Sequence, residues 1–385
     1  MASTLLSQVG ELLTVDIDCM DPEVAKRHTA STVTPFFCDM TSNQAIVGGE
    51  ARRPEQAALL RLAIDQVKEK HNPDSDSFAQ DVIDIFTVLL AKQVYPYLRG
   101  NVHAQTSPPA AFDIQKTVVH ARKLVGLFEA NGIPKYVLAY LFKCGVELIA
   151  LIGRRSRVCI KIPTTAEGMV ACAQLKTEGI QTLATCLFNV PQALAAHQAK
   201  CVYVAPYFNG IIAFFILILA HKVNAYYYFV TFQELRVHFE PTIWREYAAP
   251  GKEHPMSQVI FDVKAIYGKV GSKTKVMPAS IVTPREVIGL VSLKPDHLTI
   301  SGGILDKLAA LPQVAPQDLD SGLKITEFAE EILSADYLAS DGILLKEALE
   351  KDVESTRKLN DALKLFDEAE KKTKEYIHEI AMKEH

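Results

Sequence analysis

The chain has 385 residues, of which 49% are hydrophobic and 22% are charged, and its net charge is −4. A single α/β barrel needs about 250 residues, so the chain has room for one barrel with additions or for two ordinary domains. The small net charge excludes a strong attraction to nucleic acid. The longest uncharged apolar stretch, residues 209–220, is shorter than the roughly 20 residues of a membrane-spanning helix.

The seven cysteines indicate a reducing compartment. None forms a CxxC pair, and most stand in apolar runs, where a reduced cysteine behaves as a small hydrophobic residue. This pattern argues against a zinc site. The N-terminal segment MASTLLSQVGELL contains a glutamate and no basic region, unlike a signal peptide. We therefore expect a cytoplasmic protein.

Short β-rich runs alternate with longer helical patterns along the chain. The predicted strands are residues 14–18, 36–40, 98–105, 158–162, 182–187, 202–206, 275–280 and 297–301. Predicted helices between them include residues 54–70, 115–131, 165–178, 190–198 and 284–293. This alternation implies parallel strands with right-handed crossovers. Eight such units favour a single (β/α)8 TIM barrel over an open doubly wound sheet, and no GxGxxG motif follows a predicted strand.

Two segments fall outside the repeat. Residues 211–257 contain an aromatic run and Trp244, and we interpret them as an insertion after strand six. A packed extra helix or hairpin is the simpler interpretation, and a substrate lid or an oligomer contact is the alternative. Residues 337–385 are predicted to be helical throughout and to pack across the barrel rather than to self-associate. Their expected apolar stripe consists of Leu345, Leu349, Val353, Leu359, Leu363 and Phe366.

The predicted organisation is therefore a catalytic barrel over residues 1–310, which includes the insertion, and a C-terminal helical extension over residues 311–385.

The most informative segment is the predicted strand VCIKI, which carries Lys161. Strand alternation places Cys159 and Lys161 on one face and branched apolar residues on the other. The lysine should then point into the barrel near the carboxyl end of its strand, where barrel active sites lie. Burial lowers the pKa of an amine and exposes a nucleophile that can condense with a ketone to an iminium. The alternative is a structural lysine with a carboxylate partner.

Several stretches around this lysine recur in a known order. They are KIPTTAEGMVACAQLKTEGIQTLAT (161–185), VYVAPYFN (202–209), KVMPASIVTPREV (275–287), TVDIDCMDPE (14–23) and MTSNQAIV (40–47). Together they resemble the transaldolase family, and within it the smaller fructose-6-phosphate aldolase type. The resemblance implies a class I aldolase or transaldolase that uses a dihydroxyacetone-like donor and needs no metal ion and no organic cofactor. A role in sugar-phosphate metabolism, such as the pentose phosphate pathway, follows from the family alone.

The resemblance implies a role for each matching residue. Lys161 corresponds to the Schiff-base nucleophile, and Asp18 to the acid/base that handles the substrate hydroxyl proton. Thr185 would help to hold the catalytic water. Asn43 would bind a donor hydroxyl, and Ser280 would line the far end of the substrate.

Two departures from the classical transferases match the aldolase subtype. Gln105 and Tyr207 stand where classical transaldolases have glutamate and phenylalanine. Together these side chains could orient a water molecule for iminium formation and hydrolysis. Leu183 also matches the subtype, whereas the length and the C-terminal helix resemble the classical transferases. Transfer of the donor to an aldehyde and its release to water both remain open.

The family's phosphate-binding arginines are missing at their usual positions, where Gly210 and Val282 stand. Arginine is the favoured phosphate clamp because its guanidinium binds oxygens in a bidentate manner. Arg285 and Lys275 are close in sequence, but their positions favour a surface role. Our hypothesis is that the enzyme uses an unphosphorylated or otherwise modified carbonyl substrate.

Two further side chains could face the barrel interior. His103 shares a strand with Gln105, and a packed or solvated histidine is the simpler interpretation. Asp16 shares a strand with Asp18 and could orient it or tune its pKa. The expected partners are small ketose and aldehyde substrates and possibly a second copy of the chain. The alternative function is a barrel that has lost catalysis and serves as a binding or scaffold protein.

Overall fold

The computed structural model describes residues 4–29, 35–134, 137–139, 153–155, 157–210 and 246–383. Its parallel strands are β1 (Thr14–Ile17), β2 (Val102–Gln105), β5 (Val158–Pro163), β6 (Gln181–Leu187), β7 (Tyr203–Pro206), β8 (Lys275–Val276) and β9 (His297–Ile300). Every residue of β5 is buried. Burial on both faces is expected of a parallel sheet that is covered by helices, and it explains the apolar composition of these runs.

Backbone hydrogen bonds join the strands into a ring. The order is β2-β5-β6-β7-β8 in one set and β1-β9 in the other, and all of these pairs are parallel. Met40 bridges Ile17 and Val102 in parallel and so connects β1 to β2. On the other side, the amide of Thr299 in β9 donates to the carbonyl of Pro278, just after β8, at 3.3 Å. The predicted (β/α)8 barrel is confirmed, with the strand around Met40 held by isolated bridges.

Two strands are shorter than predicted. The run at 98–105 becomes a strand only at Val102, because the preceding residues leave a 3-10 turn at Tyr95–Tyr97. The run at 275–280 ends as a strand at Val276. Pro278 lacks an amide hydrogen, and Ser280 has a left-handed φ of 61°, so neither suits a continuous ladder.

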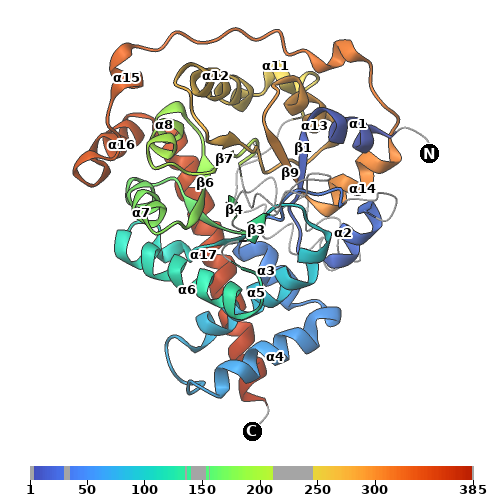
Figure 1. Ribbon diagram of the computed structural model, residues 1–385, viewed down its shortest axis with the longest axis vertical. Coiled ribbons are helices and arrows are strands. Elements are labelled where there is room, and N and C mark those ends of the chain that lie inside the picture. The colour runs from blue at the N-terminus through green and yellow to red at the C-terminus, as the bar shows by residue number, and fades with distance from the viewer. Residues whose placement is uncertain are drawn as a thin grey trace, which may run out of the picture.

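Helices surround the ring (Figure 1). The helices of the barrel region are α1 (Leu5–Leu12), α2 (Pro22–Thr29), α3 (Gln44–Ala51), α4 (Ala57–Lys68), α5 (Phe78–Val94), α6 (Ile114–Ala130), α7 (Ala166–Thr177), α8 (Val190–Gln198), α11 (Pro250–Glu253), α12 (Pro255–Lys269), α13 (Pro284–Ser292) and α14 (Gly302–Ala310). All five predicted helices form within two residues of their expected ends, except that Pro54–Gln56 is a 3-10 turn ahead of α4.

Polar caps begin the helices that follow the strands. The side chain of Asn43 accepts from two amides of α3, and Thr165 accepts from the amide of Gly168 in α7. Asn189 and Thr283 cap α8 and α13 in the same way. Such caps satisfy amides that lack a partner within the helix. They also explain why polar residues gather at the carboxyl ends of the strands.

The insertions are described only in part. Strands β3 (Val137–Ala139) and β4 (Gly153–Arg155) form an antiparallel pair between α6 and β5, which the sequence analysis did not predict. Most of the predicted insertion at 211–257, including Trp244, lies outside the described residues. Its last residues belong to α11 and to the start of α12. No helix in the described part of the chain is both long and apolar enough to span a membrane.

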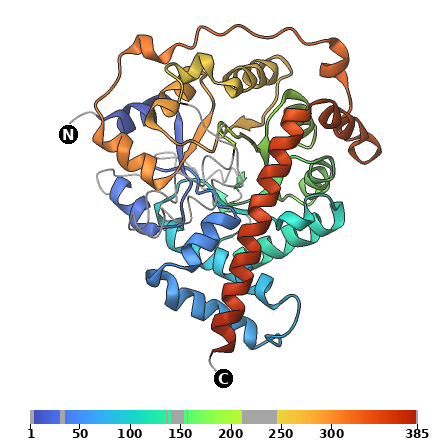
Figure 2. The same ribbon diagram turned by 180° about the vertical axis from the view of Figure 1, so that it is seen from behind.

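The C-terminal segment is not one continuous helix. It contains α15 (Glu330–Ser334), α16 (Ala339–Lys351) and α17 (Val353–Met382), and α16 is interrupted by left-handed residues at 340–342. In Figure 2, α17 runs as one long helix across the barrel, and it contacts α3, α5 and β6. The predicted apolar stripe is buried except for Val353, which is 75% exposed. That part of the prediction was wrong, because the break at Asp352 changes the helix phase there.

Candidate active site

Seven predicted polar side chains lie toward the carboxyl-end edge of the barrel. Each lies in the second half of a strand or in the turn that follows it, and each is at most 7% exposed. They are Asp18, Asn43, Gln105, Lys161, Thr185, Tyr207 and Ser280. Because barrel active sites lie at this edge, the structure brings the predicted site residues to the expected place.

Lys161 points into the barrel, as predicted. Its side chain is 2% exposed, and its Nζ atom donates to the carbonyl of Ser42 at 3.4 Å. The same atom lies 5.8 Å from the centre of the Tyr207 ring. Burial lowers the pKa of Lys161, and the charge of Asp18 opposes this shift only in part. No carboxylate among the described residues forms an ion pair with this amine, so the site favours an uncharged nucleophile.

Asp18 is the carboxylate whose charge acts on the Lys161 amine. Its Oδ1 atom accepts a hydrogen bond from the Thr41 hydroxyl at 2.7 Å. Burial raises the pKa of Asp18, whereas the charge of Lys161 and the bond from Thr41 lower it. The net effect raises the pKa of Asp18 and so favours its protonated form, which suits an acid/base. The partner that orients Asp18 is Thr41, not Asp16 as the sequence analysis had considered.

Thr185 and Tyr207 form a hydroxyl pair. The Thr185 hydroxyl donates to the phenolic oxygen of Tyr207 at 3.0 Å, and the tyrosine also interacts with the Cys186 thiol. Burial raises the pKa of Tyr207 well above its ordinary value, so this hydroxyl keeps its proton. The pair can therefore orient a water molecule or a substrate oxygen beside Lys161.

Gln105 stands directly opposite Lys161 in the parallel register of β2 and β5. Its Nε2 atom donates to Oε1 of Gln44 at 2.7 Å. Gln44 was not predicted, although it lies in the MTSNQ stretch. A water molecule shared by Gln105 and Tyr207 stays a prediction.

Asn43 and Ser280 differ in the hydrogen bonds that their side chains make. The Asn43 oxygen caps α3, so only its NH2 group is left for a donor hydroxyl. The hydroxyl of Ser280 is buried and has no hydrogen-bond partner within the described chain. A buried hydroxyl without a partner suits a substrate-contacting role.

A second polar network lies directly below the site, two residues earlier on the same strands. His103 pairs with Asp39 at 2.8 Å, and His297 pairs with Asp16 at 2.8 Å. Burial alone would raise the pKa of Asp39, but its hydrogen bond and charge interaction with His103 hold it below its usual value. His103 is therefore a packed histidine, the simpler of the two interpretations. Asp16, His297 and Cys38 could hold a metal ion by their donor types, but their described hydrogen bonds already explain this cluster.

The cations considered for phosphate binding lie elsewhere. Arg285 is 55% exposed in its side chain and pairs with Glu246, and Lys275 bonds to His297 at the start of its strand. Val282, at a position where the family has an arginine, is buried. Residues 211–245, which follow Gly210 directly and include two arginines, lie outside the described residues. The hypothesis of an unphosphorylated carbonyl substrate stays a prediction.

The fold and the buried amine define a barrel enzyme of the Schiff-base, class I aldolase type. The family model described as transaldolase/fructose-6-phosphate aldolase matches residues 16–377. The chain belongs to this family.

Relatives named transaldolase span most of the chain. The protein from Saccharomyces cerevisiae is 28% identical over 349 residues, which cover 87% of each chain. The Schizosaccharomyces pombe protein is 28% identical over 74% of this chain and 73% of its own. The Shewanella denitrificans protein is 26% identical over 88% of this chain and 93% of its own. These matches confirm the family and the enzyme class, and they leave the aldolase subtype open.

Proposed function

We propose that Lys161 forms an iminium with a dihydroxyacetone-like donor and that Asp18 exchanges the proton during C–C cleavage and formation. The uncharged amine attacks the donor ketone, the C=N bond forms as water leaves, and one proton taken up from solvent makes the product an iminium cation. Asp18 then accepts the proton of the hydroxyl on the carbon that will depart, the C–C bond breaks, and an aldehyde is released. The electron pair of that bond moves into the iminium and gives an enamine.

One observation carries this proposal: burial lowers the pKa of Lys161 while the described part of the chain gives it no ion-pair partner. A lowered pKa increases the fraction of uncharged amine, which is the form that condenses with a ketone. The hydrogen bond between Thr185 and Tyr207 supports a role for their hydroxyls in holding the water that is lost and regained. We assign Asn43 and Ser280 to the donor's hydroxyl groups.

Borohydride trapping tests the assignment directly. Reduction in the presence of dihydroxyacetone should add the mass of one reduced donor to the peptide that contains Lys161. Lys161→Met should abolish the adduct, because methionine fills the same space without an amine. Lys346, an exposed lysine in α16, gives the matched control: Lys346→Met should keep the full adduct. No mass gain on Lys161, as expected of a scaffold protein, would reject the proposal.

The fate of the donor unit forms a separate question. Gln105 and Tyr207 support release of the donor to water, as in the aldolase subtype. Product analysis with and without an acceptor aldehyde distinguishes the two reactions: free donor accumulates in an aldolase, whereas turnover of a transferase requires the acceptor. Rates on fructose 6-phosphate and on its unphosphorylated analogue then test the hypothesis of an unphosphorylated carbonyl substrate, which a strong preference for the phosphate sugar would overturn.

A further inference from the structure

The C-terminal helix α17 places a buried carboxylate beside the candidate site. Glu370 is 2% exposed, and its Oε1 atom accepts from the hydroxyl of Ser107 at 2.6 Å and from Nζ of Lys374 at 2.8 Å. Ser107 lies two residues after Gln105, so these bonds fix the carboxylate next to the end of β2. The other oxygen, Oε2, is buried and has no hydrogen-bond partner within the described residues. Such an atom is costly to bury unless a donor reaches it.

The side-chain amide of Gln105 also has a buried acceptor without a hydrogen-bond partner in the described part of the chain. Its nitrogen donates to Gln44, while its Oε1 atom is buried and lacks a partner in the described part of the chain. An amide oxygen and a carboxylate oxygen are both acceptors, so they cannot satisfy each other directly. A donor that reaches both is required.

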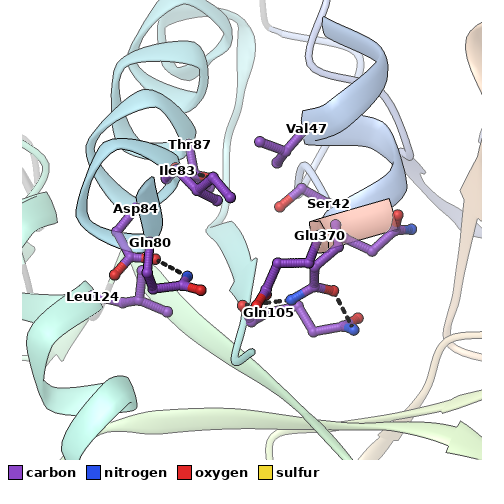
Figure 3. Close-up of a pocket in the computed structure, with 11 residues that line it drawn as sticks. Ser42, Val47, Gln80, Ile83, Asp84, Thr87, Gln105, Leu124 and Glu370 are labelled. Atoms are coloured by element: carbon purple, nitrogen blue, oxygen red, sulfur yellow. Dashed lines mark hydrogen bonds between the residues drawn. The ribbon is translucent and has the colours of Figure 1, made fainter. Parts of the chain in front are cut away.

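The two side chains line one small cavity. Figure 3 shows Gln105 and Glu370 on one side of it and Gln80 and Asp84 on the other. The cavity measures about 20 Å³, and one water molecule needs about 10–15 Å³ in a polar site. The buried Oε1 atom of Gln80 is a third acceptor in the cavity without a partner among the described residues. A water molecule has two O–H donors, so it can bond Gln105 and Glu370 at the same time. Ser42, whose carbonyl accepts from Lys161, also lines the cavity and so joins it to the reacting amine.

We infer that Glu370 is a positioning residue of the active site, and that through a water molecule in this cavity its carboxylate fixes the amide of Gln105 beside Lys161. The inference rests on the function proposed above. With its oxygen held by the water and one N–H held by Gln44, the amide keeps its second N–H for a water or hydroxyl at the iminium carbon. Gln105 stands where classical transaldolases have glutamate. In this chain Glu370 of α17 thus supplies a carboxylate behind Gln105, on the side away from Lys161.

Three variants test the inference. Glu370→Leu should lower kcat about tenfold with KM unchanged, because losing one buried hydrogen bond and misorienting a reacting-site group has an effect of that order. Glu370→Gln should restore kcat to within about twofold, since either polar atom of an amide can bond the water. Leu363→Ala changes the same buried face of α17 two turns earlier. It should lower the Tm at least as much as Glu370→Leu and leave kcat of the folded protein unchanged.

Each result decides one question. Full kcat in a folded Glu370→Leu variant would overturn the positioning role, and so would an equal loss of kcat in Leu363→Ala, which would reduce Glu370 to a stabiliser of the helix. Borohydride trapping on the unmodified protein separates the two proposals. If Lys161 gains the donor mass while Glu370→Leu keeps full kcat, only the role of Glu370 fails. If the unmodified protein gains no mass, the proposed function itself fails.

Discussion

Thr41→Val should shift the pH dependence of C–C cleavage by changing one hydrogen bond to Asp18. The Thr41 hydroxyl donates to Asp18 at 2.7 Å and lowers its pKa, against burial, which raises it. Valine keeps the shape and removes the donor. A hydrogen bond to a charged group contributes about 1.5–3 kcal/mol, and about 1.4 kcal/mol corresponds to one pKa unit. The rising limb of the kcat–pH profile should therefore move to higher pH by at least about one unit.

The assay is kcat for cleavage of a ketose donor across pH, with the aldehyde product measured. Cleavage needs the carboxylate form of Asp18, so kcat should rise with pH through the pKa of this group and do so later in the variant. Thr299→Val is the control. It removes a hydroxyl that bonds to Thr41 at 2.6 Å, but the hydrogen bond from Thr41 to Asp18 stays in place. An unchanged limb in Thr41→Val, or an equal shift in the control, would refute the assignment of Asp18 as the titrating base.

Three other substitutions give sharp expectations. Asp18→Asn should keep donor trapping on Lys161 but lower the rate of cleavage by about 10²–10⁴-fold, the usual effect of a general acid/base. Because burial raises the pKa of Asp18, the unmodified protein loses stability as pH rises through that pKa. The variant should therefore have a higher Tm than the unmodified protein at pH 7 but not at pH 3, where Asp18 is protonated in both the folded and the unfolded state. Tyr207→Phe should keep donor trapping on Lys161 and slow hydrolysis of the iminium about tenfold, as measured by single-turnover kinetics. Gly168→Ala should lower the free energy of unfolding by about 1–3 kcal/mol in urea titration, because the added Cβ would lie 2.3 Å from the carbonyl oxygen of Pro163.

The barrel and its reactive edge could be predicted from the sequence because they depend on local patterns. Apolar runs of strand length alternate with helical periods, and Lys161 alternates with branched apolar residues on β5. These features fix which face points inward without any knowledge of distant contacts. Strand ends were less predictable: Val276 ends β8 where the sequence still looks extended, because the turn into Ser280 needs a left-handed residue.

Contacts between distant segments could not be predicted in this way. Glu370 reads as one more charged residue of a solvated helix, yet it is buried, because α17 lies across the barrel and brings it to Ser107, 263 residues earlier in the chain. The partner of Asp18 was likewise missed. Thr41 and Asp18 come from different strands, and only the ring closure places their side chains together.

The opposite pKa shifts of Lys161 and Asp18 suggest how donor binding prepares the next step. Burial favours the uncharged form of both groups, which raises the pKa of the acid and lowers that of the amine. The iminium that cleavage requires is a cation, so condensation with uptake of a proton replaces a neutral amine by a positive charge beside Asp18. That charge lowers the pKa of Asp18 at the stage when cleavage requires a carboxylate to accept a proton. Formation of the first intermediate therefore creates the base that the second step needs, and the same burial that disfavours charge in the free enzyme makes this coupling strong.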